Sequence, residues 1–284
     1  MRQDVGVPEA LERFTWVVVH AHPDDEALLT AGSMAKAAAE GHRVVLVVAT
    51  DGGAGLAAAA AVAEGRTLAE TRLRELEESA RRLGVARVVH LGFGDSGLDG
   101  LGAGLPAGVA AFAQVAVDEA AARIAAVLAE ERADAISVYD PAGGYGHPDH
   151  VQVHRAGSAA ARLAGTPLVL EATVPRDRLL RAIRLASRVY RFPPEFDPTS
   201  FERAFSAAGT ITHRIDVRHQ LAAKRASMAA HASQSTADSG DRTLAAFLRM
   251  PGPLYRRVFR TEWYVEPGRP PGDCGDLFAT LRGR

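Results

Sequence analysis

Two short runs in this sequence of 284 residues combine metal-binding and proton-transferring side chains. The first, residues 20–26, reads His-Ala-His-Pro-Asp-Asp-Glu and follows three consecutive valines. The second, residues 145–150, reads Tyr-Gly-His-Pro-Asp-His and also follows a short apolar run. Imidazole nitrogens and carboxylate oxygens are suitable ligands for a borderline divalent cation such as Zn²⁺. If both runs lie at the ends of parallel strands, they can meet across one crevice and build a hydrolytic metal site.

The metal ligands and the base can be assigned from their spacing. His22 and Asp25 are three residues apart on the predicted turn, close enough to bind one ion, and His150 can complete the set from across the sheet. A catalytic zinc site uses three protein ligands and keeps a position open for water. Asp24, adjacent to a ligand but pointing elsewhere, is then the natural general base for the attacking water. We expect Zn²⁺, and Fe²⁺ is able to occupy the same ligands.

Two alternatives compete for the first run. Asp24 and Asp25 could simply favour the N-terminus of the following helix without any metal, but two runs at matched strand ends favour the metal site. A dinucleotide site needs a Gly-rich turn, so that the backbone can approach a pyrophosphate. Residues 22–26 are bulky and anionic and would repel phosphate. The sequence therefore excludes the dinucleotide class.

The elements that must position these runs alternate along the first part of the chain. The apolar runs are nearly continuous, which is typical of strands covered on both faces. Their alternation with helical patterns predicts an α/β, Rossmann-like, doubly wound and mostly parallel sheet. In such sheets ligands bind at the carboxyl ends of the strands. The expected strands are residues 14–19, 43–50, 86–91, 133–139 and 167–173, and the expected helices are residues 27–40, 68–83 and 115–132.

The remainder of the chain is less regular. Residues 52–65 are Gly/Ala-rich and could form either a mobile loop over the crevice or a poor helix. We expect one domain over residues 1–284, with an α/β core and metal site in 1–175 and a C-terminal elaboration in 176–284 that contributes to the substrate crevice. Within the elaboration we expect helices at 175–191 and 217–231, a polar loop at 233–241 and a strand at 261–265.

Composition excludes several classes of protein. The formal net charge is −1 and 47% of the residues are hydrophobic, so there is no bulk electrostatic reason to expect nucleic acid or an anionic membrane as a partner. The N-terminal residues show no apolar signal segment, and no apolar run approaches the roughly 20 residues that span a bilayer. Cys274 is the only cysteine, which excludes intrachain disulfides and cysteine-rich zinc sites. We expect a cytoplasmic enzyme, and its oligomeric state stays open.

Residues 21–26 together with residues 146–150 resemble the zinc-dependent N-acetylglucosaminyl deacetylase family, the PIG-L/LmbE-like proteins. The preceding residues 139–145, Tyr-Asp-Pro-Ala-Gly-Gly-Tyr, look especially like its actinobacterial branch, which holds the mycothiol-pathway deacetylase and its conjugate amidase. The resemblance covers most of the chain, although residues 52–65 and 176–210 carry little of it. Similar segments also occur at residues 72–76, 83–85 and 224–234.

The resemblance implies the same zinc ligands and the same base, and it adds further roles. His147 would stabilise the oxyanion as an imidazolium or protonate the leaving amine; otherwise it only packs in the loop. Tyr145 would polarise the amide carbonyl from its glycine-flanked loop, or it merely lines the pocket. Asp149 either orients a neighbouring histidine or caps the helix that follows. Glu26 either hydrogen-bonds a ligand or favours the helix N-terminus.

A second group of residues is expected to contact the substrate. Asp51 and Asp95 occupy the predicted rim, where carboxylates could accept hydrogen bonds from sugar hydroxyls, although both could be ordinary turn aspartates. Arg72 either binds a polar substrate or pairs with Glu75 one turn along the helix. His231 either approaches the metal crevice or faces solvent from its helix.

These expectations combine into one function. We expect a zinc-dependent hydrolase that removes an N-acetyl group from an N-acetylglucosamine-containing small molecule or glycoconjugate, by metal-activated water and an Asp general base. One alternative is an amidase that cleaves mycothiol-type S-conjugates with the same chemistry. A catalytically idle sugar-binding module is another, but such a protein has no need to keep the base Asp24. A redox or metal-storage role fits poorly with the hard ligand set and the remote Cys274.

Overall fold

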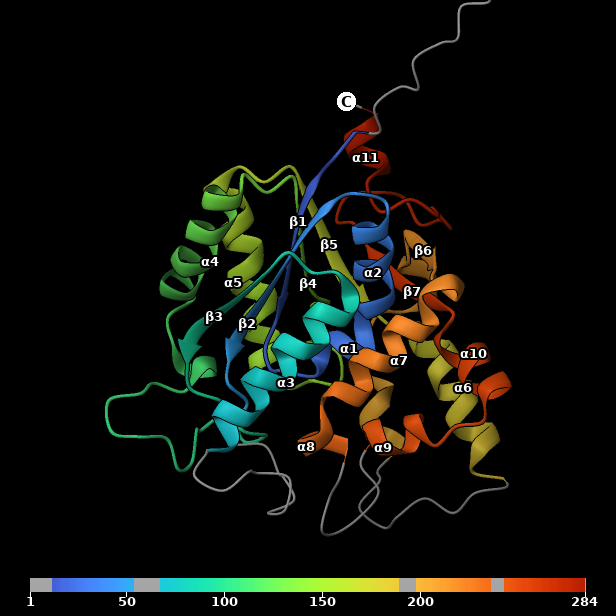
Figure 1. Cartoon of the computed structure of the whole chain (residues 1–284), viewed down its shortest axis with the longest axis horizontal. Helices are drawn as coiled ribbons and strands as arrows, with labels where there is room; N and C mark the ends of the chain where they lie inside the picture. The colour runs from blue at the N-terminus through green and yellow to red at the C-terminus, as the bar shows by residue number, and fades with distance from the viewer. Residues whose placement is uncertain (1–11, 54–66, 189–197, 236–242, 284) are drawn as a thin grey trace, which may run out of the picture.

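A computed structural model describes residues 12–53, 67–188, 198–235 and 243–283. Its centre is a seven-stranded sheet in the order β3-β2-β1-β4-β5-β7-β6 (Figure 1). The first five strands pair in parallel, and β7 pairs antiparallel with both β5 and β6. The expected mostly parallel α/β sheet is therefore confirmed. The strands are β1 (Thr15–His20), β2 (Arg43–Thr50), β3 (Arg87–Phe93), β4 (Ala135–Tyr139), β5 (Leu168–Thr173), β6 (His213–Asp216) and β7 (Thr261–Val265).

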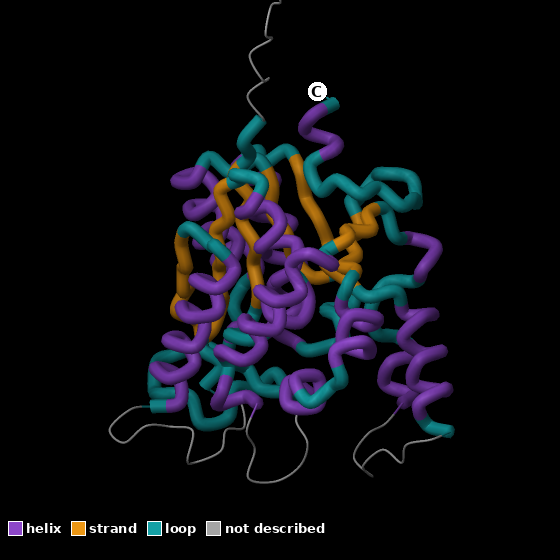
Figure 2. The backbone as a smooth tube through the Cα atoms, turned by 45° about the vertical axis from the view of Figure 1, so that its right-hand side comes forward, coloured by secondary structure: helices purple, strands orange, loops and turns teal. Residues whose placement is uncertain are grey.

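Helices cover both faces of the sheet, which explains why the strands are apolar on both sides (Figure 2). The first layer consists of α4 (Val117–Glu131) and α5 (Pro148–Ala164), which pack against each other. The opposite layer consists of α1 (Asp25–Leu29), α2 (Ala31–Ala39), α3 (Leu68–Leu83) and α7 (Leu221–Ala230). The remaining helices are α6 (Arg176–Ala186), α8 (Ala232–Ser235), α9 (Thr243–Leu248), α10 (Gly252–Phe259) and α11 (Ala279–Arg282), with 3₁₀ turns at Phe112–Gln114, Pro198–Glu202, Ala208–Thr210 and Arg218–Gln220.

The central strand β1 shows how the two cores form. Val17 and Val19 are buried against the α4/α5 side, while Trp16 and Val18 are buried in the core on the other side. Alternate side chains of a strand point to opposite faces, so a run of valines serves both layers. Fully burying one such side chain contributes roughly 1.5–3 kcal/mol. These two cores hold the carboxyl end of β1 in place.

The strand order creates a crevice at that end. From β1 the chain moves outward through β2 to β3, and then returns to place β4 on the other side of β1. Open α/β sheets bind ligands where the strand order reverses in this way. The turns after β1 and β4 hold residues 21–24 and 140–147, and each histidine-containing run continues into the helix that follows. Both histidine-containing runs therefore leave the sheet at its switch point, as the sequence predicts.

Four predicted elements differ from the structure. The expected helix at 175–191 ends at Ala186, residues 187–188 form a turn, and residues 189–191 lie outside the described residues. The expected helix at 27–40 is divided at Thr30, whose hydroxyl lies 2.8 Å from His20 Nε2. The expected helix at 217–231 starts later, because residues 218–220 form a 3₁₀ turn that follows β6. The predicted loop at 233–241 is wrong over residues 233–235, which belong to α8. Residues 236–241 and most of the segment 52–65 lie outside the described residues.

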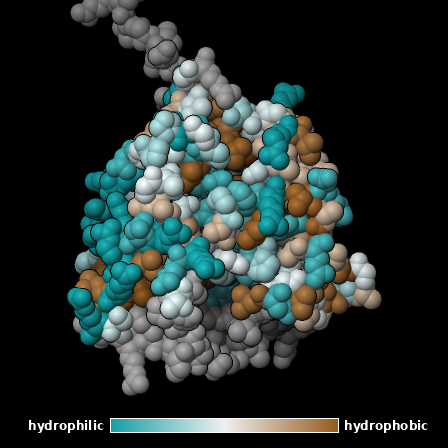
Figure 3. All heavy atoms as spheres, turned by 180° about the vertical axis from the view of Figure 1, so that it is seen from behind, coloured by the Kyte–Doolittle hydropathy of each residue, from teal (hydrophilic) through white to brown (hydrophobic). Residues whose placement is uncertain are grey.

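The elaboration joins the core through the sheet, because β6 and β7 belong to the same seven-stranded sheet as the five parallel strands. The single-domain organisation stays a prediction. Seen from behind, hydrophilic and hydrophobic residues are interspersed, without one broad apolar face (Figure 3). Among the described residues no helix combines the length and apolarity needed to cross a membrane.

Candidate active site

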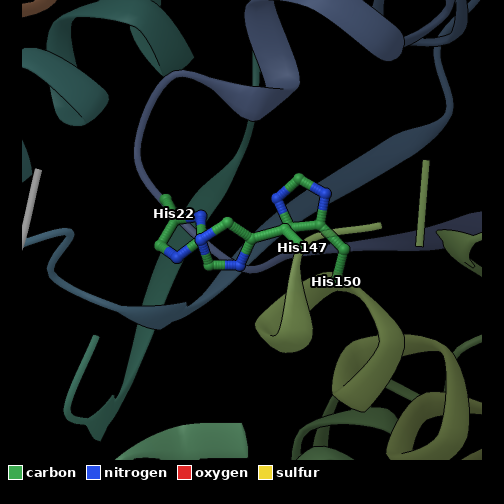
Figure 4. Close-up of side chains that lie close together, drawn as sticks. All are labelled: His22, His147 and His150. Carbon is green, nitrogen blue, oxygen red and sulfur yellow. The ribbon is translucent and has the colours of Figure 1, made fainter. Parts of the chain in front are cut away.

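The site forms where the turn after β1 meets the N-terminus of α5. His147 is the N-cap of α5, and Pro148 occupies the first turn, where its missing N–H is not needed. His22 reaches this point from the β1–α1 turn, so its ring lies beside those of His147 and His150 (Figure 4). The ring centroids are 4.7 Å and 5.4 Å from His22, respectively. Residues 125 or more positions apart in the sequence thus share one crevice.

Two of the predicted metal ligands, both histidines, converge on a carboxylate oxygen of the third. Asp25 Oδ2 lies 3.3 Å from His22 Nδ1 and 3.3 Å from His150 Nε2, and all three side chains are buried. Both ring nitrogens of His150 are buried without a hydrogen-bond partner in the described part of the chain. Buried polar atoms normally have partners, so these orphaned nitrogens are suited to an additional ligand. One oxygen and two imidazoles are a donor set that fits a divalent cation such as zinc.

The second nitrogen of His22 is held by carboxylates. His22 Nε2 lies 3.1 Å from Asp149 Oδ2 and 3.4 Å from Asp95 Oδ1. Burial alone would lower the pKa of His22, but hydrogen bonds to Asp149, Asp25 and Asp95 raise it well above its usual value. A carboxylate behind a ligating histidine fixes its ring orientation and increases its basicity. Of the two roles weighed for Asp149, the structure therefore shows contact with a neighbouring histidine.

Tyr139, the last residue of β4, supports two of the predicted ligands. Its hydroxyl donates a 2.6 Å hydrogen bond to Asp25 Oδ2, and its ring stacks on His150 at 4.1 Å with an interplanar angle of 7°. Sequence reasoning gave Tyr139 no role. Its position at the carboxyl end of a strand next to β1 was the only signal that could have identified it.

Asp24 has an unusual backbone conformation and lies beside the charged side chain of Arg72. Its φ of 109° lies in the left-handed region, which side chains other than glycine rarely adopt. Its Oδ2 lies 3.3 Å from Arg72 Nη2. Burial raises the pKa of Asp24 to about 6, although the positive charge of Arg72 opposes that shift. A carboxylate with a pKa near neutrality is suited to general-base work.

Arg72 does not form the helical ion pair considered above. Its guanidinium instead donates to Gly52 O at 2.5 Å and to Pro23 O at 2.6 Å. Glu75 accepts hydrogen bonds from the backbone and hydroxyl of Ser233. Arg72 is buried and ties the ends of β1 and β2 together beside the predicted base.

His147 is held in one tautomer. Its Nδ1 accepts the backbone N–H of Asp149 at 3.2 Å, which leaves Nε2 to carry the ring proton. Burial, with the nearby His22 and His150, lowers the pKa of His147 to about 4. This geometry favours a neutral N–H donor over the imidazolium implied by the resemblance. His147 also lies within ligand reach: one atom each from His22, His147 and His150 fall within 4.8 Å of one another, as do atoms from a second set made of His22, Asp95, His147 and Asp149.

Tyr145 projects over the site from the loop before α5. Its ring centroid is 5.0 Å from that of His150, and 49% of the residue is exposed. Burial of the hydroxyl and the negative charge of Asp25 raise its pKa, so the group stays a protonated donor. The flanking Gly144 and Gly146 have φ of 63° and 94°, which allow this exposed turn.

The predicted substrate-binding residues have different surroundings. Asp51 is half-buried, and its Oδ1 accepts the N–H of Gly53, as a turn aspartate does. Asp95 is buried beside His22 rather than open at the rim. His231 is fully buried, so the solvent-facing alternative is wrong; its Nε2 lies 2.6 Å from Glu26 Oε1. Contact of these residues with substrate stays a prediction.

Comparisons with known proteins agree with this geometry. The profile of the family described as PIG-L, GlcNAc-PI de-N-acetylase, matches residues 17–161. A 1D-myo-inositol 2-acetamido-2-deoxy-alpha-D-glucopyranoside deacetylase from Thermobifida fusca is 36% identical over 294 residues, covering 93% of this chain and 98% of the relative. Because the alignment covers nearly the whole of both chains, it spans the α/β core and most of the elaboration.

Solved structures share the fold at lower identity. The N,N'-diacetylchitobiose deacetylase from Pyrococcus horikoshii is 20% identical with a TM-score of 0.54, covering 90% of this chain and 84% of that one. The 4-carboxy-2-hydroxymuconate hydratase from Pseudomonas putida is 16% identical with a TM-score of 0.53, covering 92% and 98%. A hydratase and a deacetylase on one fold show that the reaction must be argued from the site.

Proposed function

Because the chain belongs to the GlcNAc-PI de-N-acetylase family, we propose that it removes the N-acetyl group from an N-acetylglucosamine-containing small molecule or glycoconjugate. The observation that carries this proposal is the convergence of His22 Nδ1 and His150 Nε2 on Asp25 Oδ2, each at 3.3 Å. These three residues would hold a divalent cation, for which we propose zinc, with Fe²⁺ as the alternative. When bound, such a cation polarises an amide carbonyl and makes water acidic enough to deprotonate near neutral pH.

The protein's own residues would then divide the proton transfers. Asp24 takes a proton from the attacking water, whose oxygen forms the new bond to the carbonyl carbon. Arg72, 3.3 Å from Asp24, keeps that carboxylate ionised against the effect of burial. Tyr145, at the rim of the crevice, donates a hydrogen bond from its hydroxyl to the carbonyl oxygen. A protonated phenol in a partly desolvated site can stabilise the developing oxyanion.

His147 supports the second half of the reaction. Its Nδ1 is occupied by the Asp149 N–H, so its Nε2–H can point at the oxyanion or at the leaving nitrogen. The carbon–nitrogen bond breaks as the nitrogen receives the proton that Asp24 took from the water, while the neutral His147 donates only a hydrogen bond. The products are acetate and a free amino sugar, and the proton that Asp24 took from water returns with the amine.

The relatives suggest which sugar to test. The T. fusca relative is named for an inositol-linked N-acetylglucosamine, and we propose a conjugate of this class as the substrate. The alternative is an amidase acting on a larger mycothiol-type S-conjugate, in which the same residues cleave an amide with a different acyl group. A pocket that accepts an unacetylated sugar with a long acyl arm would favour that alternative.

The test is release of primary amine from an N-acetylglucosaminyl-inositol conjugate and from free N-acetylglucosamine, with and without a chelator. Chelator-sensitive release that zinc restores supports the deacetylase, and a faster rate for the conjugate supports recognition of the inositol. Full zinc occupancy without release from either compound would reject this substrate class and leave the S-conjugate. Release that is insensitive to exhaustive chelation would contradict the metal site.

A further inference from the structure

Glu26 is a buried carboxylate at the site to which the proposed chemistry gives no step. The residue has no exposed surface, and both of its oxygens accept hydrogen bonds. Glu26 Oε2 accepts the backbone N–H of Asp24 at 2.9 Å. Glu26 Oε1 lies 2.6 Å from His231 Nε2 and accepts the Ser79 hydroxyl at 2.6 Å. Glu26 therefore joins the backbone of the proposed base to two side chains that are remote in the sequence.

Glu26 and its two side-chain partners lie in or directly beside three different helices. Glu26 lies in the first turn of α1, Ser79 near the end of α3 and His231 directly after α7. The Ser79 hydroxyl also lies 2.7 Å from the hydroxyl of Ser227, one turn before His231. α7 packs against both α1 and α3, as Figure 1 shows. The carboxylate is thus fixed from the C-terminal elaboration as well as from the core.

Glu26 accepts a hydrogen bond from the backbone of Asp24, whose conformation is unfavourable without support. Asp24 has φ 109° and ψ −25°, a conformation that persists in a protein only when its surroundings impose it. Its N–H points to Glu26 Oε2, while its side chain reaches Arg72 in another direction. A hydrogen bond to an ionised carboxylate is stronger than one to a neutral acceptor. Loss of this acceptor would free the peptide to rotate and carry the Asp24 carboxylate away from its place.

We propose that Glu26 is the positioning residue of Asp24, and that His231 and Ser79 hold Glu26 for this task. The inference rests on the proposed function, because it takes Asp24 to be the base. It gives His231 a role through Glu26 rather than through contact with a sugar. The contact between the His231 ring and Glu26 is made by Nε2, which lies 2.6 Å from Glu26 Oε1.

The main test is Glu26→Gln, measured as kcat, KM and zinc content. Glutamine has nearly the same shape but only one acceptor oxygen, so it cannot accept from Asp24 on one side and from His231 and Ser79 on the other. We expect kcat to fall about 10- to 100-fold, since small displacements of a reacting group cost this much. KM and zinc content should stay within about twofold, because Glu26 contacts neither the ligand nitrogens nor the open crevice.

A matched control is Glu262→Gln. Glu262, on β7, is another buried carboxylate, and it accepts the N–H groups of Gly32 and Ser33 in the first turn of α2 at 2.8 and 2.7 Å. It also pairs with Lys224 of α7, but it does not contact Asp24. This variant should lose stability and keep kcat. An equal fall of kcat in both variants would mean that Glu26 has only a structural role.

A second pair of variants keeps the inference testable if Glu26→Gln does not fold. His231→Gln retains an N–H donor for Glu26, whereas His231→Met removes it at similar size. We expect His231→Gln to retain kcat within about threefold and His231→Met to lose about 10-fold. Equal kcat in the two variants would overturn the inference.

Asp24→Asn, assayed in parallel, separates the inference from the proposed function. An inactive Asp24→Asn with a fully active Glu26→Gln would overturn the positioning role alone. A fully active Asp24→Asn would overturn the base assignment and the inference with it. Loss of kcat in both variants at full zinc content supports both.

Discussion

The parallel core and the C-terminal elaboration both contribute buried charged side chains, but in different ways. Core residues such as His22, Asp25 and His150 face one another with unpaired nitrogen atoms left over. The elaboration instead contributes charges that are paired with the core, His231 with Glu26 and Glu262 with the N-terminus of α2. Unpaired groups can bind a ligand, whereas paired groups fix geometry. Substitutions of the core ligands should therefore impair metal binding, whereas substitutions of the paired groups should alter the geometry or the stability that those groups maintain.

The largest effect is expected at the core ligands. His150→Ala removes one of the two imidazole nitrogens that converge on the Asp25 carboxylate, and we expect loss of both bound zinc and amine release. Metal analysis after dialysis against zinc checks this, with circular dichroism to show that the fold persists. A His150→Ala protein that binds zinc stoichiometrically would favour the other set of nearby ligands, which includes His147.

The second-largest effect is expected at Tyr139, which contacts two of the proposed metal ligands. Tyr139→Phe keeps the ring that stacks on His150 but removes the hydroxyl that donates to Asp25 Oδ2. Substitution of such a supporting group typically weakens metal affinity about 10- to 100-fold. Competition with a zinc-binding dye measures it. Unchanged affinity would show that the Asp25 carboxylate does not depend on Tyr139 for its orientation.

The buried ion pair of the elaboration that lies away from Asp24 should affect stability instead. Lys224 and Glu262 form a buried ion pair at 2.5 Å, and Lys224 Nζ also donates to Leu28 O. Lys224→Met leaves the Glu262 carboxylate buried without its counter-charge, which typically costs about 3–5 kcal/mol. Urea unfolding of zinc-loaded protein measures this cost. Kinetic constants of the folded variant should stay near those of the parent, and a selective loss of kcat would break the distinction between the two regions.

A smaller effect is expected from a core carboxylate outside the site. Burial, assisted by the negative charge of Asp140, raises the pKa of Glu171 on β5 to about 7, above its ordinary 4.5. The folded state then binds more protons than the unfolded state between these two values, so stability falls as pH rises through this window. Glu171→Gln should raise the free energy of unfolding by about 1–2 kcal/mol at pH 8 and leave it unchanged near pH 4.5. An equal gain at both pH values would contradict the titration.

More of the core than of the elaboration could be predicted from the sequence, for a physical reason. The two histidine-containing runs could be placed because parallel strands bring their carboxyl ends to one edge, which periodicity alone reveals. The bond between Glu26 and His231 joins residues 205 positions apart and depends on how α7 packs, which no local pattern encodes. The same holds for β6, whose four residues are too short to stand out, and for Tyr139, whose role depends on the strand beside it.

The most direct test of the account is amine release by Asp24→Asn loaded with one zinc per chain. The substitution preserves the size of the side chain and removes the group whose pKa burial raises to about 6. The account predicts that kcat falls by about 10²- to 10⁴-fold while zinc stays bound, as expected for loss of a general base. Amine release at the parental rate from the zinc-loaded variant would contradict the central claim that Asp24 activates water beside a metal held by His22, Asp25 and His150.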